Sequence, residues 1–243
     1  MKRYFLLLIA AFLLAITANA RTYALVVGIS NYHDGINDVQ WTTASAKKFA
    51  SMLKAHTKDV SILTSKYATG SNILSKLGAI AKSAGADDRI IFFYSGHGET
   101  GGLATPSGIL PYDQIIKVLA SSKAKYKFCF IEACHSGSVA ASAPNSPGWH
   151  SAAKKNNIVF FTGCRPEESS MVSATIGSGL FSQALIKGLR GKADYNRDKG
   201  ITVLELFKYT FNDVVQRAKA INAEQHPQLI GPKALQDVVI LKW

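Results

Sequence analysis

Asp88-Arg-Ile-Ile-Phe-Phe-Tyr94 is the stretch that decides the fold, and Ser95-Gly-His-Gly98 follows it at once. A nearly unbroken apolar run of this length, ended by glycine, is typical of a strand that is buried on both faces. A second run, Tyr126-Lys-Phe-Cys-Phe-Ile131, is followed by Glu132-Ala-Cys-His-Ser-Gly137. The two runs predict two central strands of a parallel sheet, each of which ends next to a chemically reactive side chain.

Further strands and helices alternate on both sides of these two strands. Strands are predicted at residues 23–29, 59–63, 158–162 and 237–241, and helices at residues 43–56, 72–81, 113–119, 179–191 and 202–220. The last helix opens on a capping box, Thr202-Val-Leu-Glu205. Such alternation predicts an α/β fold with a mainly parallel central sheet and helices on both faces. We expect residues 237–241 to close this sheet, the glycines around Pro106 to form a hairpin or ordered loop, and residues 135–156 to form a long irregular segment.

The composition limits the class of protein but not its function. The chain has 243 residues, of which 47% are hydrophobic and 18% charged, and this combination excludes intrinsic disorder. The net charge of +12 is compatible with nucleic acid, acidic surfaces or no particular partner. Three cysteines are too few, and odd in number, for a disulfide framework. The motifs must therefore indicate the function.

The first twenty residues have the pattern of a secretory signal peptide. Lys2 and Arg3 precede an apolar run at residues 4–17, and Ala18-Asn-Ala20 follows with small residues at the cleavage positions. A membrane anchor is the alternative, but the run is shorter than the roughly 20 residues that a span needs. We expect residues 1–20 to be removed near Ala20, leaving a secreted or periplasmic protein without a stable membrane anchor.

His97 and Cys134 follow the two central strands, and parallel strands bring their carboxyl ends to one edge of the sheet. A thiol nucleophile and an imidazole base or acid together suffice for acyl transfer. The backbone N–H groups of Gly98 and Cys134 are the expected oxyanion hole. A lone cysteine after an apolar strand is more often a core residue, as we expect for Cys129 and Cys164, and a lone histidine is usually on the surface. Found together, the pair favours catalysis.

The two motifs and their spacing resemble the caspase-like cysteine peptidases, the group of caspases, metacaspases and legumain. Other matching stretches are Leu25-Val-Val-Gly-Ile-Ser-Asn-Tyr32, residues 191–202 with Glu205, and Gln225-His-Pro-Gln228. The resemblance implies a three-layer caspase-hemoglobinase-like fold, with residues 21–243 as a single peptidase domain. It also implies an endopeptidase with a Cys-His dyad that acts on protein or peptide substrates through an acyl-enzyme.

The resemblance extends to the substrate pocket. In legumain and metacaspases the acidic residue two places before the cysteine lines this pocket, and here it is Glu132. Glu132 favours Arg or Lys before the scissile bond, with Asn as the second choice; the alternative is that it caps a loop or pairs with a local lysine. Ser45 stands where metacaspases carry a second acid. Ser169 and Ser170 fall in a stretch similar to the family's substrate-binding segment.

Residues 194–205 contain oxygen donors at calcium-loop spacing. Asp194, Asn196, Asp198 and Glu205 occupy positions one, three, five and twelve, but the glycine comes one place late. We expect a turn before a capped helix and no cofactor, with calcium activation as the alternative. The basic runs lack a nucleic-acid motif, so no nucleic acid is expected.

Two other functions remain open. The same dyad would serve a transpeptidase or ligase, since an amine can also capture an acyl-enzyme. A non-catalytic binding protein that retains the fold is the other alternative. The residues do not fix the oligomeric state.

Overall fold

The computed structural model describes residues 20–32, 37–99, 101–134, 148–173 and 177–242. Within them, the largest sheet has the strand order β12-β8-β7-β3-β1-β2. These strands are β1 (Thr22–Gly28), β2 (Val60–Thr64), β3 (Arg89–Ser95), β7 (Tyr126–Glu132), β8 (Ile158–Thr162) and β12 (Gln228–Ile230). All neighbours run parallel except β12, which is antiparallel to β8. The predicted, mainly parallel sheet is therefore confirmed.

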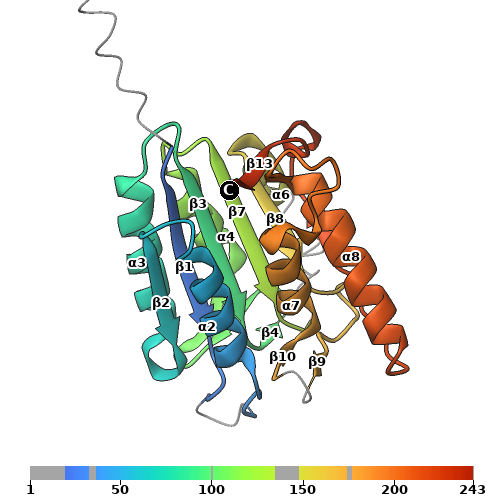
Figure 1. Ribbon diagram of the computed structural model, residues 1–243. Coiled ribbons are helices and arrows are strands. Elements are labelled where there is room, and N and C mark those ends of the chain that lie inside the picture. The colour runs from blue at the N-terminus through green and yellow to red at the C-terminus, as the bar shows by residue number, and fades with distance from the viewer. Residues whose placement is uncertain (1–19, 33–36, 100, 135–147, 174–176, 243) are drawn as a thin grey trace, which may run out of the picture.

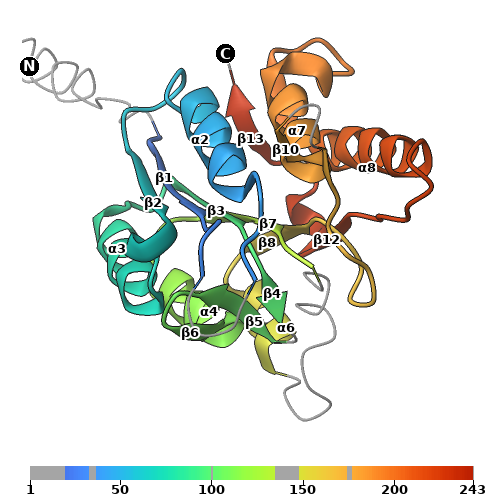
Figure 2. The ribbon, with the colours of Figure 1, turned by 90° about the horizontal axis from the view of Figure 1, so that it is seen from below.

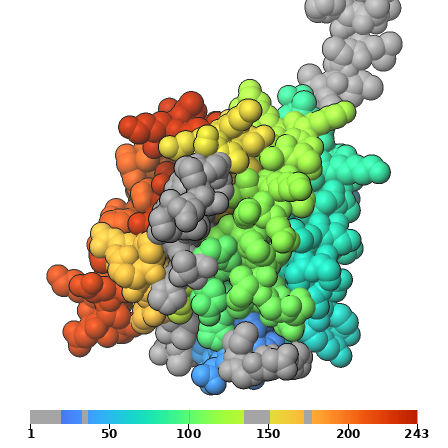
Figure 3. All heavy atoms as spheres, turned by 180° about the vertical axis from the view of Figure 1, so that it is seen from behind, coloured from blue at the N-terminus to red at the C-terminus, as the bar shows by residue number. Residues whose placement is uncertain are grey.

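Helices cover both faces of this sheet and make three layers (Figures 1 and 2). One face carries α2 (Thr42–Leu53), α7 (Leu180–Lys187) and α8 (Val203–Lys219). The opposite face carries α3 (Gly70–Ser83), α4 (Tyr112–Ala120) and α6 (Gly148–Lys155), and Figure 3 shows it in space-filling form.

The central strands are apolar because both of their faces are covered. In β3, Ile90, Phe92 and Tyr94 belong to the core under α3 and α4, whereas Ile91 and Phe93 belong to the core under α2 and α7. The ring of Phe93 stacks on Phe49 of α2 at 4.3 Å between centroids. Full burial of each such side chain stabilises the fold by about 1.5–3 kcal/mol. A one-residue slip would exchange the two faces, so this pattern also fixes the register.

Smaller sheets lie around the central one. β4 (Gly98–Glu99), β5 (Gly102–Thr105) and β6 (Gly108–Pro111) form an antiparallel sheet, which confirms the predicted hairpin after Gly98. β9 (Val172–Ser173) pairs with β10 (Ser178–Gly179). The short helical turns are η1 (Ser65–Tyr67), η2 (Gly188–Lys192) and η3 (Lys233–Leu235).

The prediction that residues 237–241 close the main sheet is wrong. β13 (Val239–Lys242) pairs antiparallel with β11 (Gly200–Thr202), and β12 is the strand that pairs with β8. An apolar run indicates a strand but not its partner, and β12 has only three residues and no alternating pattern from which to predict it. The helix predicted at residues 179–191 ends at Lys187 and continues as the wider turn η2, in which Gly191 has a φ of 102°.

The predicted signal peptide lies outside the described residues except for Ala20, which is exposed. In the part of the chain that the structure describes, none of the helices combines the length and the apolar character needed to cross a bilayer. Of the predicted irregular segment, residues 148–155 form α6, and residues 135–147 lie outside the described part.

Candidate active site

Three loops meet at the carboxyl edge of the main sheet, onto which Figure 2 looks. The chain crosses from β1 to β2 on one side, whereas β3, β7 and β8 follow on the other side of β1. Connections that leave two neighbouring strands in opposite directions open a crevice at their carboxyl ends, which is where α/β sheets place their sites. The loops after β1, β3 and β7 lie at this edge of the sheet.

The pairing register places the loops that carry His97 and Cys134 next to each other. Ser95 and Glu132 are partners at the ends of β3 and β7, and the N–H of Gly96 donates to the carbonyl of Glu132 at 3.1 Å. His97 and Cys134 each come two residues after this last pair. The two predicted catalytic residues therefore lie on adjacent loops at the same height of the sheet.

Gly98 lets these two loops touch. A Cβ atom at this position would collide with the carbonyl oxygen of Cys134 and lie 2.9 Å from the Cβ of Ala133. Both contacts are closer than real Cβ atoms tolerate, and one of them is with backbone that has no rotamer to adjust. Gly98, predicted to help bind the oxyanion, thus packs directly on the backbone of Cys134.

Two buried tyrosines position the backbone of His97. Its N–H donates to the hydroxyl of Tyr32 at 2.7 Å, and the hydroxyl of Tyr94 donates toward its carbonyl at 2.7 Å. The ring of Tyr32 also lies 5.0 Å from the imidazole, centroid to centroid. Burial raises the pKa of both tyrosines, so their hydroxyls stay neutral. The sequence does not indicate a role for either tyrosine, because a buried tyrosine also fits the core.

The loop after β1 orients the imidazole. Nε2 of His97 lies 2.7 Å from the carbonyl oxygen of Asn37. A carbonyl can only accept, so Nε2 carries a proton, and in the neutral ring Nδ1 is the free base. Asp38 closes this loop, since its carboxylate accepts from the N–H of Tyr32 at 2.9 Å and from Asn31 at 3.0 Å. Sequence reasoning missed Asn37 because a backbone carbonyl leaves no trace in residue type.

The three cysteines differ in exposure. The side chain of Cys134 is partly exposed, whereas Cys129 and Cys164 are buried. Burial raises the pKa of the Cys129 thiol, and the thiol of Cys164 lies 3.3 Å from the carbonyl of Ala133 and 3.2 Å from that of Glu168. A reactive thiol needs access as well as ionisation, so Cys134 is the suitable nucleophile among the three.

Glu132, two residues before Cys134, belongs to a small buried cluster of polar side chains. Its residue is 4% exposed, and its carboxylate accepts from the hydroxyl of Ser95 at 2.8 Å. It also accepts from the N–H of Ser182 at 2.8 Å and from the hydroxyl of Ser182 at 2.9 Å. Ser182 is the third residue of α7, so Glu132 caps the N-terminus of that helix.

Ser45 joins the same cluster from α2. Its hydroxyl accepts from the N–H of Gly179 at 3.1 Å, lies 3.0 Å from the hydroxyl of Ser178, and is also hydrogen-bonded to Glu132. Burial raises the pKa of Glu132 and outweighs the opposing hydrogen bonds from Ser182, Ser95 and Ser45. Every donor that reaches this carboxylate from the described residues is neutral. The structure thus brings Ser45 and Glu132 together without a local lysine.

Ser169 and Ser170 lie in the loop after β8. Ser169 is exposed, and the hydroxyl of Ser170 lies 3.5 Å from Nε2 of Gln225. Gln225 fixes the loop, because it donates to the carbonyl of Gly163 at 2.8 Å and accepts from the N–H of Met171 at 2.9 Å. These contacts place Ser170 beside the end of β8.

Glu168 forms a second buried carboxylate in this loop. Its Oε1 lies 2.6 Å from Nδ1 of His226 and 3.8 Å from the guanidinium of Arg165, and its Oε2 accepts from the N–H of His226 at 2.7 Å. Burial opposes ionisation of this carboxyl, but the N–H of Arg165 and the contacts with His226 hold its pKa below the ordinary value. Sequence resemblance had marked His226 without indicating this partner.

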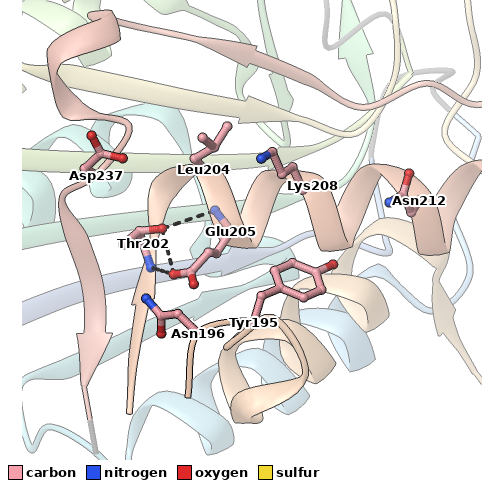
Figure 4. A pocket seen from close by; sticks show the side chains of 8 residues that line it. All are labelled: Tyr195, Asn196, Thr202, Leu204, Glu205, Lys208, Asn212 and Asp237. Carbon is pink, nitrogen blue, oxygen red and sulfur yellow. Dashed lines mark hydrogen bonds between the residues drawn. The ribbon is translucent and has the colours of Figure 1, made fainter. Parts of the chain in front are cut away.

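The calcium-loop candidates form a turn whose oxygens bond to its own backbone. The N–H of Asp198 lies 3.2 Å from Asp194 Oδ1 and 3.0 Å from Asn196 Oδ1, and the N–H of Gly200 lies 2.8 Å from Asp198 Oδ1. Glu205 makes the predicted capping box with Thr202. In Figure 4 Glu205 faces a pocket of about 550 Å³ that Asn196 also lines. Among the described residues, no three His, Cys, Asp or Glu side chains form a group suited to a metal ion.

Comparison with known proteins identifies related sequences and folds. The sequence profile of the caspase domain matches residues 21–238. A probable protease from a Desulfuromonadales bacterium is 23% identical over 86% of the chain, and the chain spans only 32% of that relative. The crystal structure of a Geobacter sulfurreducens protein has a TM-score of 0.64 at 18% identity and covers 89% of this chain and 97% of its own. Caspase-1 from Spodoptera frugiperda has a TM-score of 0.63 at 18% identity, over 87% of each chain.

Proposed function

The chain belongs to the caspase domain family of cysteine-type peptidases, and on that premise we propose that it is a secreted cysteine endopeptidase that cleaves after Arg or Lys. The observation that carries the proposal is the register of β3 and β7, which puts His97 and Cys134 on touching loops. The family implies protein or peptide substrates. The bond cleaved, the specificity and the compartment are proposals.

Peptide cleavage would proceed in two stages on this dyad. The sulfur of Cys134 attacks the scissile carbonyl carbon while its proton passes to Nδ1 of His97. The C–N bond then breaks, and His97 returns the proton to the leaving amine, which leaves a thioester. A water molecule gives a proton to His97 as its oxygen attacks the thioester, and this proton returns to the departing sulfur. The N–H groups of Gly98 and Cys134 would stabilise the oxyanion in each stage.

The contacts around His97 support this assignment of its two nitrogens. Asn37 holds Nε2–H, so Nδ1 is the atom that remains for proton transfer. Tyr32 and Tyr94 fix the backbone on either side of the imidazole, which limits how far the ring can move. Catalysis depends on such fixed orientation, because a displaced base loses much of its rate enhancement.

The cluster around Glu132 supports a basic residue before the scissile bond. Its carboxylate is buried among neutral donors, and a guanidinium or ammonium from the substrate would supply the missing positive charge. Ser45 contributes a hydroxyl where a second acid would bind a cation more tightly. Ser45 and Ser178 also suit the amide of an asparagine, so Asn remains the second choice. Ser169 and Ser170 are proposed to contact the substrate at the rim.

We propose export on the signal-peptide pattern of residues 1–20. Mass spectrometry of the protein from the periplasm or medium should find Arg21 as the N-terminal residue. Protein that keeps its first twenty residues and stays in the cytoplasm would contradict export.

The decisive test is covalent labelling of the chain that begins at Arg21. Acyloxymethyl ketones that carry Arg or Lys should label Cys134, which peptide mapping by mass spectrometry identifies. Cys134→Ala should abolish both labelling and turnover, while Cys129→Ala, which removes a buried thiol, should keep both. Absence of labelling at Cys134 by Arg, Lys and Asn probes would contradict the proposal.

A fluorogenic panel that varies only the residue before the scissile bond then ranks Arg, Lys, Asn and Asp. Because the dyad supplies both nucleophile and base, we propose that no cofactor takes part, and equal rates with calcium and with a chelator would support this. An added amine separates hydrolysis from ligation, since a ligase gives the amide product in the mass spectrum.

A further inference from the structure

A groove of about 530 Å³ lies between α2 and α7, on the face of the sheet opposite α3 and α4. Figure 2 shows these two helices side by side on that face. The residues that line the groove come from one side of each helix and from the turn after α7: Lys47, Lys48, Ser51, Gln183, Ile186, Lys187 and Arg190. The candidate active site uses none of them.

The rim of this groove is positively charged. Lys47, Lys48, Lys187 and Arg190 are exposed, and no carboxylate from the described residues lines the groove. Asp213 lies 3.7 Å from the ammonium of Lys187 but also 3.1 Å from the guanidinium of Arg217, and Lys48 donates to the carbonyl of Gly177 at 3.1 Å. One carboxylate shared by two cations leaves the rim with a net positive charge.

The floor of the groove is formed by one polar and one apolar side chain, both buried. Gln183 and Ile186 are each 7% exposed and form its base. The amide of Gln183 is fixed at both ends, because its oxygen accepts from Arg217 at 2.6 Å and its nitrogen donates to the carbonyl of Ser178 at 3.3 Å. A preformed floor reduces the entropy that a bound chain would lose on ordering the site.

We propose that this groove binds an acidic peptide segment. An apolar side chain of the segment packs on Ile186, and flanking carboxylates pair with Lys47 and Arg190. Compact phosphates instead favour helix N-termini, where backbone N–H groups point at the ligand. This groove runs along the sides of α2 and α7, away from their N-termini. The charge pattern therefore fits an extended chain with spaced carboxylates.

Fluorescence anisotropy of a labelled twelve-residue peptide, four Glu around a central Leu, tests the proposal. A second peptide in which Gln replaces each Glu is the control. The acidic peptide should bind the chain that begins at Arg21 more tightly than the Gln peptide and should weaken with added salt. The double variant Lys47→Glu/Arg190→Glu should weaken binding about tenfold or more, because two attractions become repulsions. The control is Lys82→Glu/Lys123→Glu, which makes the same change in net charge outside the groove. It should change the affinity for the acidic peptide by no more than about twofold.

Equal loss of affinity in the two double variants would show a general effect of net charge and would contradict binding in the groove. Lack of binding by the acidic peptide at low salt would also overturn it. An oligonucleotide or anionic vesicles that bind more tightly than the peptide, and lose binding only in Lys47→Glu/Arg190→Glu, would assign the groove to another polyanion. The anisotropy needs no peptidase activity, so it stands or falls apart from the proposed function.

Discussion

Two buried glutamates flank the loop that carries Cys134, and their surroundings are opposite. Glu132 is surrounded by the hydroxyls of Ser95, Ser45 and Ser182 and by one backbone N–H, and burial raises its pKa. Glu168 contacts the imidazole of His226, and its pKa lies below the ordinary value despite its burial.

Only one of the two carboxylates has cationic partners within the described residues. Glu168 has its cationic and hydrogen-bonding partners in Arg165 and His226, and it links β8's loop to the segment before β12. Glu132 has only neutral donors from the described residues, so its negative charge lacks an equal partner. A buried charge without a counterion destabilises a fold unless a ligand supplies one. This difference supports the proposal that Glu132 recognises the substrate, whereas Glu168 holds its loop in place.

The largest expected effect is on kcat/KM, which should depend on Glu132 but not on Glu168. Glu132→Gln should lower kcat/KM for an Arg substrate about 30- to 100-fold, because a hydrogen bond to a charged group contributes about 2–3 kcal/mol. The Asn substrate should change by less than about fivefold, since an amide can bond to either side chain. Fluorogenic kinetics on both substrates measure this.

Glu168→Gln is the matched control for that substitution, because it makes the same chemical change in the other carboxylate. It should leave the ratio of Arg to Asn turnover unchanged. A similar fall in this ratio for both variants would remove the distinction between the two glutamates.

The pH dependence of kcat/KM for an Arg substrate should also report the ionisation of Glu132, with a smaller effect. Binding of a cationic side chain needs ionised Glu132, and burial places its pKa above the ordinary value of about 4.3. For an Arg substrate, kcat/KM should therefore fall as pH is lowered through that raised pKa, by about tenfold per unit below it. Glu132→Gln should lack this step. An identical acid limb in the wild type and in Glu132→Gln would assign the limb to another group.

The sequence predicted the parts of this site that depend on residue type and strand order. The apolar runs before His97 and Cys134 identified two buried strands, and parallel pairing then requires their ends to meet. The spacing of Glu132 from Cys134 placed a carboxylate near the same edge. Ser45 was identified by resemblance, and the structure places its hydroxyl in the cluster with Glu132.

Other parts depend on tertiary contacts that residue type does not encode. The carbonyl of Asn37 reaches His97 through a loop, and every residue type has that carbonyl. Ser182 reaches Glu132 with its backbone N–H as well as its hydroxyl, from fifty positions away. The run at residues 237–241 correctly indicated a strand, but its partner β11 depends on how the chain returns after α8.

The two glutamates should also differ in how they affect the stability of the fold. Glu168→Gln should lower the free energy of unfolding at pH 7 by about 2 kcal/mol, because it removes a charge that accepts several hydrogen bonds. For a chain of this size that lowers Tm by about 4–8 °C. The depressed pKa means that this stabilisation is present above the unfolded-state value and is lost as pH falls through the folded-state value. Calorimetry should find the two proteins converging as pH falls below that folded-state value; a constant difference in Tm would contradict the role of the charge.

The smallest expected effect is a rise in Tm for Glu132→Gln, opposite in sign to the fall expected for Glu168→Gln. The raised pKa of Glu132 means that the folded state favours its protonated form, so stability declines as pH rises from the unfolded-state value through the folded-state value. At a pH above the folded-state value the wild type bears this penalty in full, and Glu132→Gln removes it. The hydroxyls of Ser95 and Ser45 can rotate to accept from the new amide, so Tm should rise by about 1–3 °C. The difference should shrink as pH falls below the unfolded-state value of about 4.3, because Glu132 becomes protonated in both states. A lower Tm at pH 7 would mean that the carboxylate already has its countercharge, and the case for a cationic substrate side chain would fall with it.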